Sequence, residues 1–264
     1  MKIFFTLIQA DLYWENTQAN LKMFNNLLEN IPPESEIVIL PEMFSTGFTM
    51  NVKNLEKPIG KKAFEWLRKK AKELNKIIIG SILFEENKKL YNRMFWTFPN
   101  GTFHYYDKRH LFHQGKEDQV ITKGNRKKIV TYKGIKFLLE ICYDLRFPVW
   151  SKNNYDIKTN TYDYDAIIYI ANWPESRKQA YLSLLRARAI ENQALVLWVN
   201  RIGEDNEGIK HSGDTQSIDM LGNIIKKAKN NQVELVNFSY DFNKLFLYRN
   251  QFKVALDWDQ FKIF

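Results

Sequence analysis

The sequence contains very little cysteine and no long apolar segment. Cys142 is the single cysteine among 264 residues. One cysteine cannot form an intramolecular disulfide, which excludes a disulfide-stapled secreted domain and favours a reducing, cytoplasmic environment. No run of about 18 uninterrupted apolar residues occurs, so we expect no transmembrane helix and no membrane partner. The apolar stretch at the N-terminus is short and runs into Asp11 without a cleavage site of small residues, and we interpret it as a strand rather than a signal peptide.

The net charge of +9 restricts the function only weakly. A basic chain is compatible with an RNA-binding protein that has no catalytic activity, and this class stays open as an alternative. The lysines are scattered, however, and the clusters near residues 123 and 224 lie beside turn signals without a nucleic-acid-binding motif. We therefore expect no nucleic-acid partner and interpret the charge as a solvated, lysine-rich surface.

Apolar, β-branched segments and helical patterns alternate in the first half of the chain. Helices are expected over residues 16–31, 60–75 and 176–193, where apolar residues recur on one face. Several expected strands are apolar on both faces, which is typical of sheets covered on both sides and of parallel pairing through right-handed crossovers. The pattern predicts a mixed α/β fold. The strands are expected at 2–10, 36–42, 76–84, 92–99, 136–144, 165–174 and 194–200.

Turn signals and polar segments organise the rest of the chain. Turns that contain glycine predict hairpins at residues 98–103 and 218–225. Residues 151–164 are polar and predict a surface loop rather than a domain boundary. The aromatic tail, about 243–264, is too apolar to lie free in water, so we expect it to dock on the body or on a partner subunit. We thus expect a single domain over residues 1–264.

Three chemically reactive side chains follow predicted strands, where functional residues of α/β proteins collect. They are Glu42, Lys108 and Cys142. A thiol attacks a carbonyl or nitrile carbon as the thiolate, so it needs a base nearby. A partly buried carboxylate can accept the proton, and an ammonium can stabilise the thiolate and the oxyanion. Each residue alone also has a plainer interpretation: Cys142 as a small buried apolar side chain, Glu42 as a helix or turn cap, and Lys108 as a surface charge.

Together with their flanks, these segments resemble the motifs of the nitrilase, or carbon-nitrogen hydrolase, superfamily. "ILPEMFSTGF" resembles the glutamate motif, "YDKRHLF" the lysine motif and "GIKFLLEICYDLRFPVW" the cysteine motif. "IYIANWPESR", "LLRARAIENQ" and "HSGDTQSIDMLGNII" are similar to later segments, so the resemblance covers about residues 3–250. It implies an αββα four-layer sandwich with two stacked mixed sheets. It also implies a Glu42–Lys108–Cys142 triad in which Cys142 is the nucleophile and no cofactor takes part.

The same resemblance suggests further site residues. A second glutamate of the family corresponds to Glu117, or to the adjacent Asp118, and is expected to orient Lys108 and compensate its charge. The backbone N–H of Tyr143 is expected to help Lys108 hold the oxyanion. The expected residues of the substrate pocket are Phe48 and Trp173.

Arginines near these motifs receive more ordinary roles. Arg146 resembles a family arginine that we expect to be structural and to pair with acidic neighbours. Arg188 and Glu191 lie three apart on a predicted helix, so they can form an ion pair or hold the cysteine loop. Arg177 is a candidate for binding a substrate carboxylate, although surface charge is the plainer interpretation.

Within the superfamily, the chain is most similar to the bacterial omega-amidase branch. Its members hydrolyse the side-chain amide of 2-oxoglutaramate or 2-oxosuccinamate, and we expect such a small-molecule amide as substrate. Nitrilase, N-carbamoylase and aliphatic amidase activities stay open, because one triad serves all of them. The resemblance and the apolar tail also imply a homodimer.

Two other catalytic arrangements have weaker support. A papain-like enzyme needs a histidine partner for Cys142, and none of the histidines lies in a recognised context for that role. A metal site at His113 and Glu117, four apart on a helix, has no third ligand, so we expect no metal. The candidate histidines are His104, His110, His113 and His211.

Overall fold

The structure is a computed structural model, and it describes residues 1–263. Two six-stranded mixed sheets form its centre, with strand orders β16-β1-β2-β3-β4-β5 and β15-β14-β11-β10-β7-β6. The first sheet contains β1 (Lys2–Gln9), β2 (Ile37–Ile39), β3 (Ile77–Glu86), β4 (Lys89–Thr97), β5 (Phe103–Asp107) and β16 (Glu234–Asp241). The second contains β6 (Ile129–Tyr132), β7 (Ile135–Ile141), β10 (Ala166–Ala171), β11 (Leu195–Asn200), β14 (Gln216–Ile218) and β15 (Ile224–Lys227).

The two sheets repeat one pairing pattern. Strands β1, β2 and β3 are parallel, as are β7, β10 and β11. In each sheet the remaining strands add to this parallel centre in antiparallel pairs. The expected crossovers between parallel strands and both expected glycine-turn hairpins are therefore confirmed.

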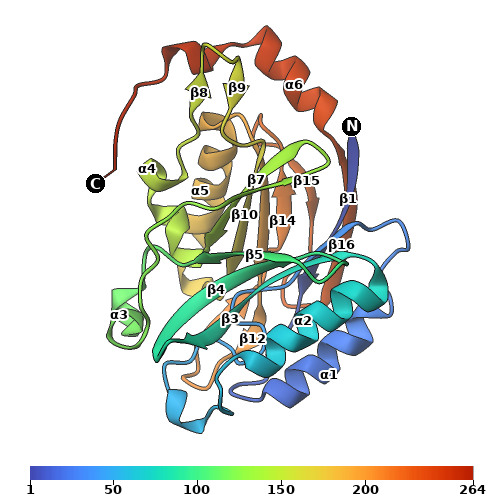
Figure 1. The fold of residues 1–264 in the computed structure, drawn as a ribbon, viewed down its shortest axis with the longest axis vertical. Helices are drawn as coiled ribbons and strands as arrows, with labels where there is room; N and C mark the ends of the chain where they lie inside the picture. The colour runs from blue at the N-terminus through green and yellow to red at the C-terminus, as the bar shows by residue number, and fades with distance from the viewer. Residues whose placement is uncertain (264) are drawn as a thin grey trace.

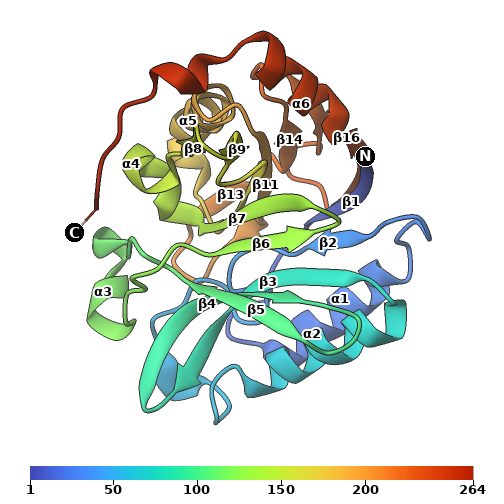
Figure 2. The same ribbon diagram turned by 45° about the horizontal axis from the view of Figure 1, so that its top comes forward.

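Helices cover the outer faces of the sheets. Helices α1 and α2 lie outside the first sheet and α5 lies outside the second (Figures 1 and 2). Asn16 caps α1 by accepting a 3.0 Å hydrogen bond from the backbone N–H of Ala19. The αββα sandwich is confirmed. The helices are α1 (Thr17–Leu28), α2 (Lys61–Leu74), α3 (Glu117–Val120), α4 (Pro148–Ser151), α5 (Lys178–Glu191) and α6 (Phe242–Gln251). Within residues 1–263, no helix combines the length and the apolar character that a bilayer span requires.

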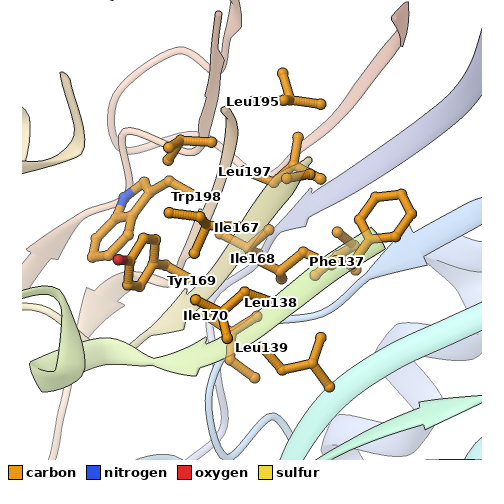
Figure 3. Packing of buried hydrophobic residues seen from close by; sticks show 14 of the residues in the cluster. Phe137, Leu138, Leu139, Ile167, Ile168, Tyr169, Ile170, Leu195, Leu197 and Trp198 are labelled. Carbon is orange, nitrogen blue, oxygen red and sulfur yellow. The ribbon is translucent and has the colours of Figure 1, made fainter. Parts of the chain in front are cut away.

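Side chains that alternate along the strands divide the core into layers. Ile37 and Ile39 of β2 pack into the cluster between the two sheets, whereas Val38 packs with α1 and α2. Across the interface, the Phe137 ring lies 5.1 Å from the Trp96 ring, centroid to centroid. Figure 3 shows Phe137 at the edge of a group of apolar side chains from β7, β10 and β11. Each fully buried side chain of this kind contributes about 1.5–3 kcal/mol, so the core holds the strand ends in fixed positions.

Two small ribbons of very short strands were not predicted from the sequence. Residues 151–164 are not a plain loop, because β8 (Tyr155–Asp156) and β9 (Thr161–Tyr162) pair within them. A second small ribbon joins β12 (Ile202–Glu204) to β13 (Lys210–Ser212). Strands of two or three residues contain no apolar run or alternation long enough to be distinguished from a turn.

The C-terminal segment crosses the outside of the second half of the chain (Figure 1). Arg249 of α6 forms a 2.6 Å ion pair with Asp165, and the Phe252 carbonyl accepts a 2.8 Å hydrogen bond from Gln193. Beyond α6, the Lys152 ammonium lies 3.8 Å from the centre of the Trp258 ring. This segment therefore contacts the body of its own chain.

Candidate active site

The ends of three strands bring together the candidate triad. Glu42 follows β2, Lys108 follows β5 and Cys142 follows β7. The Lys108 Nζ lies 3.0 Å from Glu42 Oε1, and both side chains are fully buried. The charges of Glu42 and Lys108 both act on the Cys142 thiol. Glu42 and Lys108, which are 66 positions apart, follow strands of the first sheet, and the stacking of the two sheets brings Cys142 of the second sheet to them.

Cys142 occupies a strained turn. Its φ is +47°, a left-handed conformation that is rare for a residue with a side chain. The 3₁₀ turn η3 (Cys142–Arg146) starts here, and the Asp144 carboxylate closes it by accepting a 3.0 Å hydrogen bond from the Ile141 N–H. Such strain persists where the surrounding contacts enforce it.

Asp144 also connects the cysteine turn to the lysine segment. Its carboxylate accepts a 2.8 Å hydrogen bond from the Tyr106 hydroxyl and a 3.0 Å hydrogen bond from the His110 N–H. Tyr106 and His110 flank Lys108, so one buried carboxylate fixes the position of Cys142 relative to Lys108. The sequence analysis missed this residue; its signal was an acidic side chain at the start of a short helix.

Donors on both carboxylate oxygens hold Glu42. Oε1 accepts hydrogen bonds from Lys108 and, at 2.7 Å, from the amide of Asn92. Oε2 accepts a 2.7 Å hydrogen bond from the backbone N–H of Asn172. These three donors hold the Glu42 carboxylate in one orientation, which a general base requires. Asn92 and Asn172 were also missed, because their neighbours in the sequence give no indication of these contacts.

Glu117 lies on the other side of Lys108. Its Oε2 is 2.9 Å from Lys108 Nζ and accepts a 2.6 Å hydrogen bond from the Phe112 N–H. Asn92 also donates to Glu117, at 3.2 Å, so one amide bridges the two carboxylates. Asp118, the alternative, is partly exposed and contacts His113. The structure therefore brings Glu117, and not Asp118, to Lys108.

Burial and paired charge together determine the protonation of this group. Burial alone would lower the pKa of Lys108, but Glu117 and Glu42 outweigh it and raise the pKa above its ordinary value. Burial, supported by the charge of Glu42, raises the pKa of Glu117 against the opposing effect of Lys108. The two neighbouring glutamates thus favour the charged form of Lys108.

The surroundings of Cys142 disfavour the thiolate form of its side chain. Burial and then the charge of Glu42 raise its pKa well above the ordinary value, while Lys108 and the Asn172 N–H act in the opposite direction. A thiol with a raised pKa reacts only when a base removes its proton during attack. The neighbouring carboxylate of Glu42 is suited to that task.

A cavity of about 480 Å³ opens above Cys142. Lys108, Phe48 and Trp173 line it, as do Phe112 and the Tyr143 that follows the cysteine. Phe48 also lies over the Lys108 ammonium, which is 5.2 Å from the ring centre. The wall combines aromatic rings with several charged and polar side chains, which can orient a small polar ligand.

The contacts of Arg188 agree with the expectation from the sequence, and those of Arg146 do not. Arg188 holds the cysteine turn through a 2.6 Å hydrogen bond to the Leu145 carbonyl and pairs with Glu191 at 2.9 Å, so both of its expected contacts are confirmed. The expectation for Arg146 is wrong, because no carboxylate of residues 1–263 lies within 4.0 Å of its guanidinium. That group lies over the Trp173 ring and lines the cavity instead, because the turn at Cys142 carries it toward the site.

The alternative sites do not assemble in residues 1–263. His110 contacts Asp144, and His113 is largely exposed on Asp118, away from the buried carboxylate of Glu117. His211 does line the cavity, but burial and then the charge of Arg201 lower its pKa to about 4. The groups that act on the thiol are Glu42, Lys108 and the Asn172 N–H.

A second buried carboxyl, Glu140 on β7, predicts a pH-dependent stability. Burial, and then the charge of Asp144, raise the pKa of Glu140 from 4.5 to about 8, although Ser151 donates a hydrogen bond to it. An acid with a raised folded pKa stabilises the fold fully below its unfolded pKa and loses that contribution as pH rises through about 8. We expect the free energy of unfolding, from urea titrations, to decline between about pH 4.5 and 8 and to level off above that. Glu140→Gln is expected to reduce this slope, and equal slopes in both proteins would contradict the assignment.

Stacked mixed sheets with a buried thiol beside a carboxylate and an ammonium define a carbon-nitrogen hydrolase. The sequence pattern of the carbon-nitrogen hydrolase family matches residues 5–247, and the chain belongs to this family. The resemblance carried by the three motifs is therefore confirmed.

Similar proteins agree with this assignment. The chain is 39% identical over 256 residues to omega-amidase YafV of Yersinia enterocolitica, covering 97% of this chain and 96% of that protein. It is 32% identical to the 2-oxoglutaramate amidase of Bacillus subtilis, covering 80% and 82% of the two chains. The crystal structure of a CN-hydrolase superfamily protein from Xanthomonas campestris, with an arsenic adduct in its active site, matches with a TM-score of 0.95 at 34% identity, over 100% of this chain and 99% of that one.

Proposed function

We propose that the protein is an omega-amidase, which hydrolyses the terminal amide of a short dicarboxylate monoamide and releases ammonia. The placement of Lys108 between Glu42 and Glu117, beside the thiol of Cys142 that lines the cavity, supports amide hydrolysis through a thioester. The observation that carries the omega-amidase proposal is the similarity over nearly the whole chain to an omega-amidase. The names of the relatives in Yersinia enterocolitica and Bacillus subtilis support the same substrate class.

Acylation of Cys142 is the first step of the proposed mechanism. Glu42 removes the thiol proton as the sulfur forms a bond to the amide carbon. The carbonyl oxygen becomes an oxyanion, which the Lys108 ammonium and the backbone N–H of Tyr143 stabilise. Glu42 then gives the proton to the amide nitrogen, the C–N bond breaks, and ammonia leaves a thioester behind.

Hydrolysis of the thioester completes the cycle. Glu42 removes a proton from water, whose oxygen attacks the thioester carbon, and the same oxyanion contacts stabilise the second tetrahedral intermediate. When the C–S bond breaks, Glu42 returns the proton to the sulfur and the product leaves as a carboxylic acid. Glu117 keeps Lys108 in place and compensates its charge throughout.

Ammonia release from a panel of substrates tests the proposal. We expect succinamate and 2-oxosuccinamate to be hydrolysed with a higher kcat/KM than propionamide, by roughly 10- to 150-fold, because a charge-assisted contact to the distal carboxylate contributes about 1.5–3 kcal/mol. Simple nitriles and N-carbamoyl amino acids complete the panel as substrates of the competing activities.

The panel also separates the alternatives. Faster turnover of a nitrile or a carbamoyl amino acid would overturn the omega-amidase proposal while leaving the triad in place. A ratio near one between succinamate and propionamide would indicate an aliphatic amidase. A nucleic-acid-binding protein without catalysis would release ammonia from none of these compounds and would bind RNA in a strongly salt-dependent manner.

We also propose a cytoplasmic homodimer. A catalytic thiol functions in a reducing compartment. Leu247 of α6 is 58% exposed and Phe252 and Leu256 are about half exposed, so the C-terminal segment covers its own chain incompletely. Apolar surface of this kind is typical of subunit contacts. Light scattering at micromolar concentration should give twice the chain mass of 31.5 kDa, and a mass near 31.5 kDa would contradict the dimer.

A further inference from the structure

Two guanidinium groups line the cavity without an acidic partner. Arg146 lies in η3 and Arg177 lies in η4 (Glu175–Arg177), and both side chains are partly buried. No carboxylate of residues 1–263 lies within 4.0 Å of either group, and neither guanidinium hydrogen-bonds to another described residue. A half-buried cation that is not paired within the protein requires an explanation.

Both arginines lie at the same sheet edge as the nucleophile. Strands β7 and β10 are parallel neighbours, so the turns that follow them emerge side by side. Cys142 and Arg146 are in the first of these turns. The second turn includes Trp173 and continues into Arg177. Ligands of open α/β sheets bind at such an edge.

Aromatic rings fix the orientation of both groups. The Arg146 guanidinium lies 5.0 Å from the centre of the Trp173 ring, and that of Arg177 lies 5.2 Å from the centre of the Phe112 ring. Phe112 in turn packs edge-on against Tyr143, next to the nucleophile. A guanidinium stacked on a ring keeps the N–H groups in its plane free for a carboxylate, and less entropy is lost when the ligand binds.

The acidic residues that line the cavity do not pair with the two arginines. Glu15 accepts hydrogen bonds from Thr49, at 2.6 Å, and from Asn54, at 3.2 Å. Asp205 accepts two backbone N–H groups within its own turn, which also contains Glu207. None of these three carboxylates, which lie in the loops before α1 and after β12, is within 4.0 Å of either guanidinium group.

We propose that Arg146 and Arg177 together bind the distal carboxylate of the substrate, opposite the amide that Cys142 attacks. The assignment rests on the proposed function for its substrate. The ligand chemistry is that of a short dicarboxylate monoamide, whose planar carboxylate accepts paired N–H donors from stacked guanidinium groups.

Variants of the two arginines test the assignment. Arg146→Met and Arg177→Met are each expected to lower the ratio of kcat/KM for succinamate to that for propionamide by roughly 10- to 100-fold. The double variant should lose less than the product of the two, because both groups bind one carboxylate. Arg177→Lys retains the charge without the planar fork and should fall between wild type and Arg177→Met. Arg186→Met, on the exposed face of α5, removes the same charge away from the cavity and should leave the ratio unchanged.

A binding assay that needs no turnover separates the two proposals. Succinate, which has carboxylates but no amide, should slow the labelling of Cys142 by iodoacetamide in the wild type and fail to do so in the double variant. Equal protection of both proteins, or unchanged specificity ratios in folded variants, would overturn the role of the arginines. Protection that depends on the arginines, in a protein that hydrolyses no ω-amide, would support the carboxylate site and contradict the proposed function.

Discussion

Replacement of Cys142 by alanine is expected to abolish ammonia release while the protein still folds. The thiol is the sole sulfur nucleophile of the chain and carries the proposed covalent step, so we expect turnover to fall by at least roughly 10⁴-fold. Alanine is slightly smaller than cysteine and tolerates the φ of +47° no worse, so the free energy of unfolding should change little. The measurements are ammonia release at saturating succinamate and urea unfolding of both proteins.

Chemical labelling provides the matched control for this prediction. Iodoacetamide should add one label per wild-type chain, none to Cys142→Ala, and should inactivate in proportion to labelling. Because burial and Glu42 raise the pKa of the thiol, the labelling rate should still be rising at pH 9 rather than reaching a plateau near neutrality. Activity that survives complete labelling would contradict the assignment of Cys142 as nucleophile.

The positions of the three proposed triad residues were predictable because each residue follows a strand or lies in a motif that is recognisable in the sequence. Glu42 and Cys142 end apolar runs, and Lys108 follows a hairpin whose Asn-Gly turn is a strong local signal. Glu117 was predictable only as one of two adjacent acids. Its distinction from Asp118 depends on which side of α3 faces Lys108, and a four-residue helix has no apolar periodicity that would indicate this.

The supporting residues were not predictable, because their roles arise only when distant strands pack together. Asn92 lies 50 residues from Glu42 and 25 from Glu117, yet its amide donates to both. A polar residue inside a strand, such as Asn92, interrupts the apolar pattern, but nothing in the sequence indicates that it belongs to a site. Arg146 was assigned wrongly for a related reason. Acidic neighbours in the sequence suggested an ion pair, but the turn at Cys142 directs Arg146 into the cavity and Asp144 toward Tyr106 and His110.

Replacement of Lys108 by methionine is expected to remove both activity and much of the stability. The ammonium is fully buried between Glu42 and Glu117, at 3.0 and 2.9 Å, so its loss leaves two buried carboxylates without a cation. Removing one partner of a buried pair costs about 3–5 kcal/mol. Loss of an oxyanion donor lowers turnover by roughly 10²–10³-fold, and displacement of Glu42 should add to this. Lys123→Met, an exposed lysine with no ion pair among residues 1–263, is the charge-matched control.

A second variant and the pH dependence separate the catalytic role of Lys108 from its structural role. Lys108→Met/Glu117→Gln restores the wild-type net charge of the site, so it should recover much of the stability but none of the activity.

The stability of Lys108→Met should also depend on pH. Burial and the charge of Glu42 already raise the pKa of Glu117, and removal of the lysine, which opposes them, should raise this pKa further. An acid of this kind stabilises the fold at low pH and loses that contribution as pH rises through the folded pKa, so the stability deficit should be small near pH 5 and large near pH 8. Urea unfolding at both pH values and kcat/KM for succinamate measure the two effects. Turnover within tenfold of wild type in either variant would show that Lys108 serves the fold and not the reaction, because the double variant keeps the charge balance while removing the only ammonium that contacts Glu42 in residues 1–263.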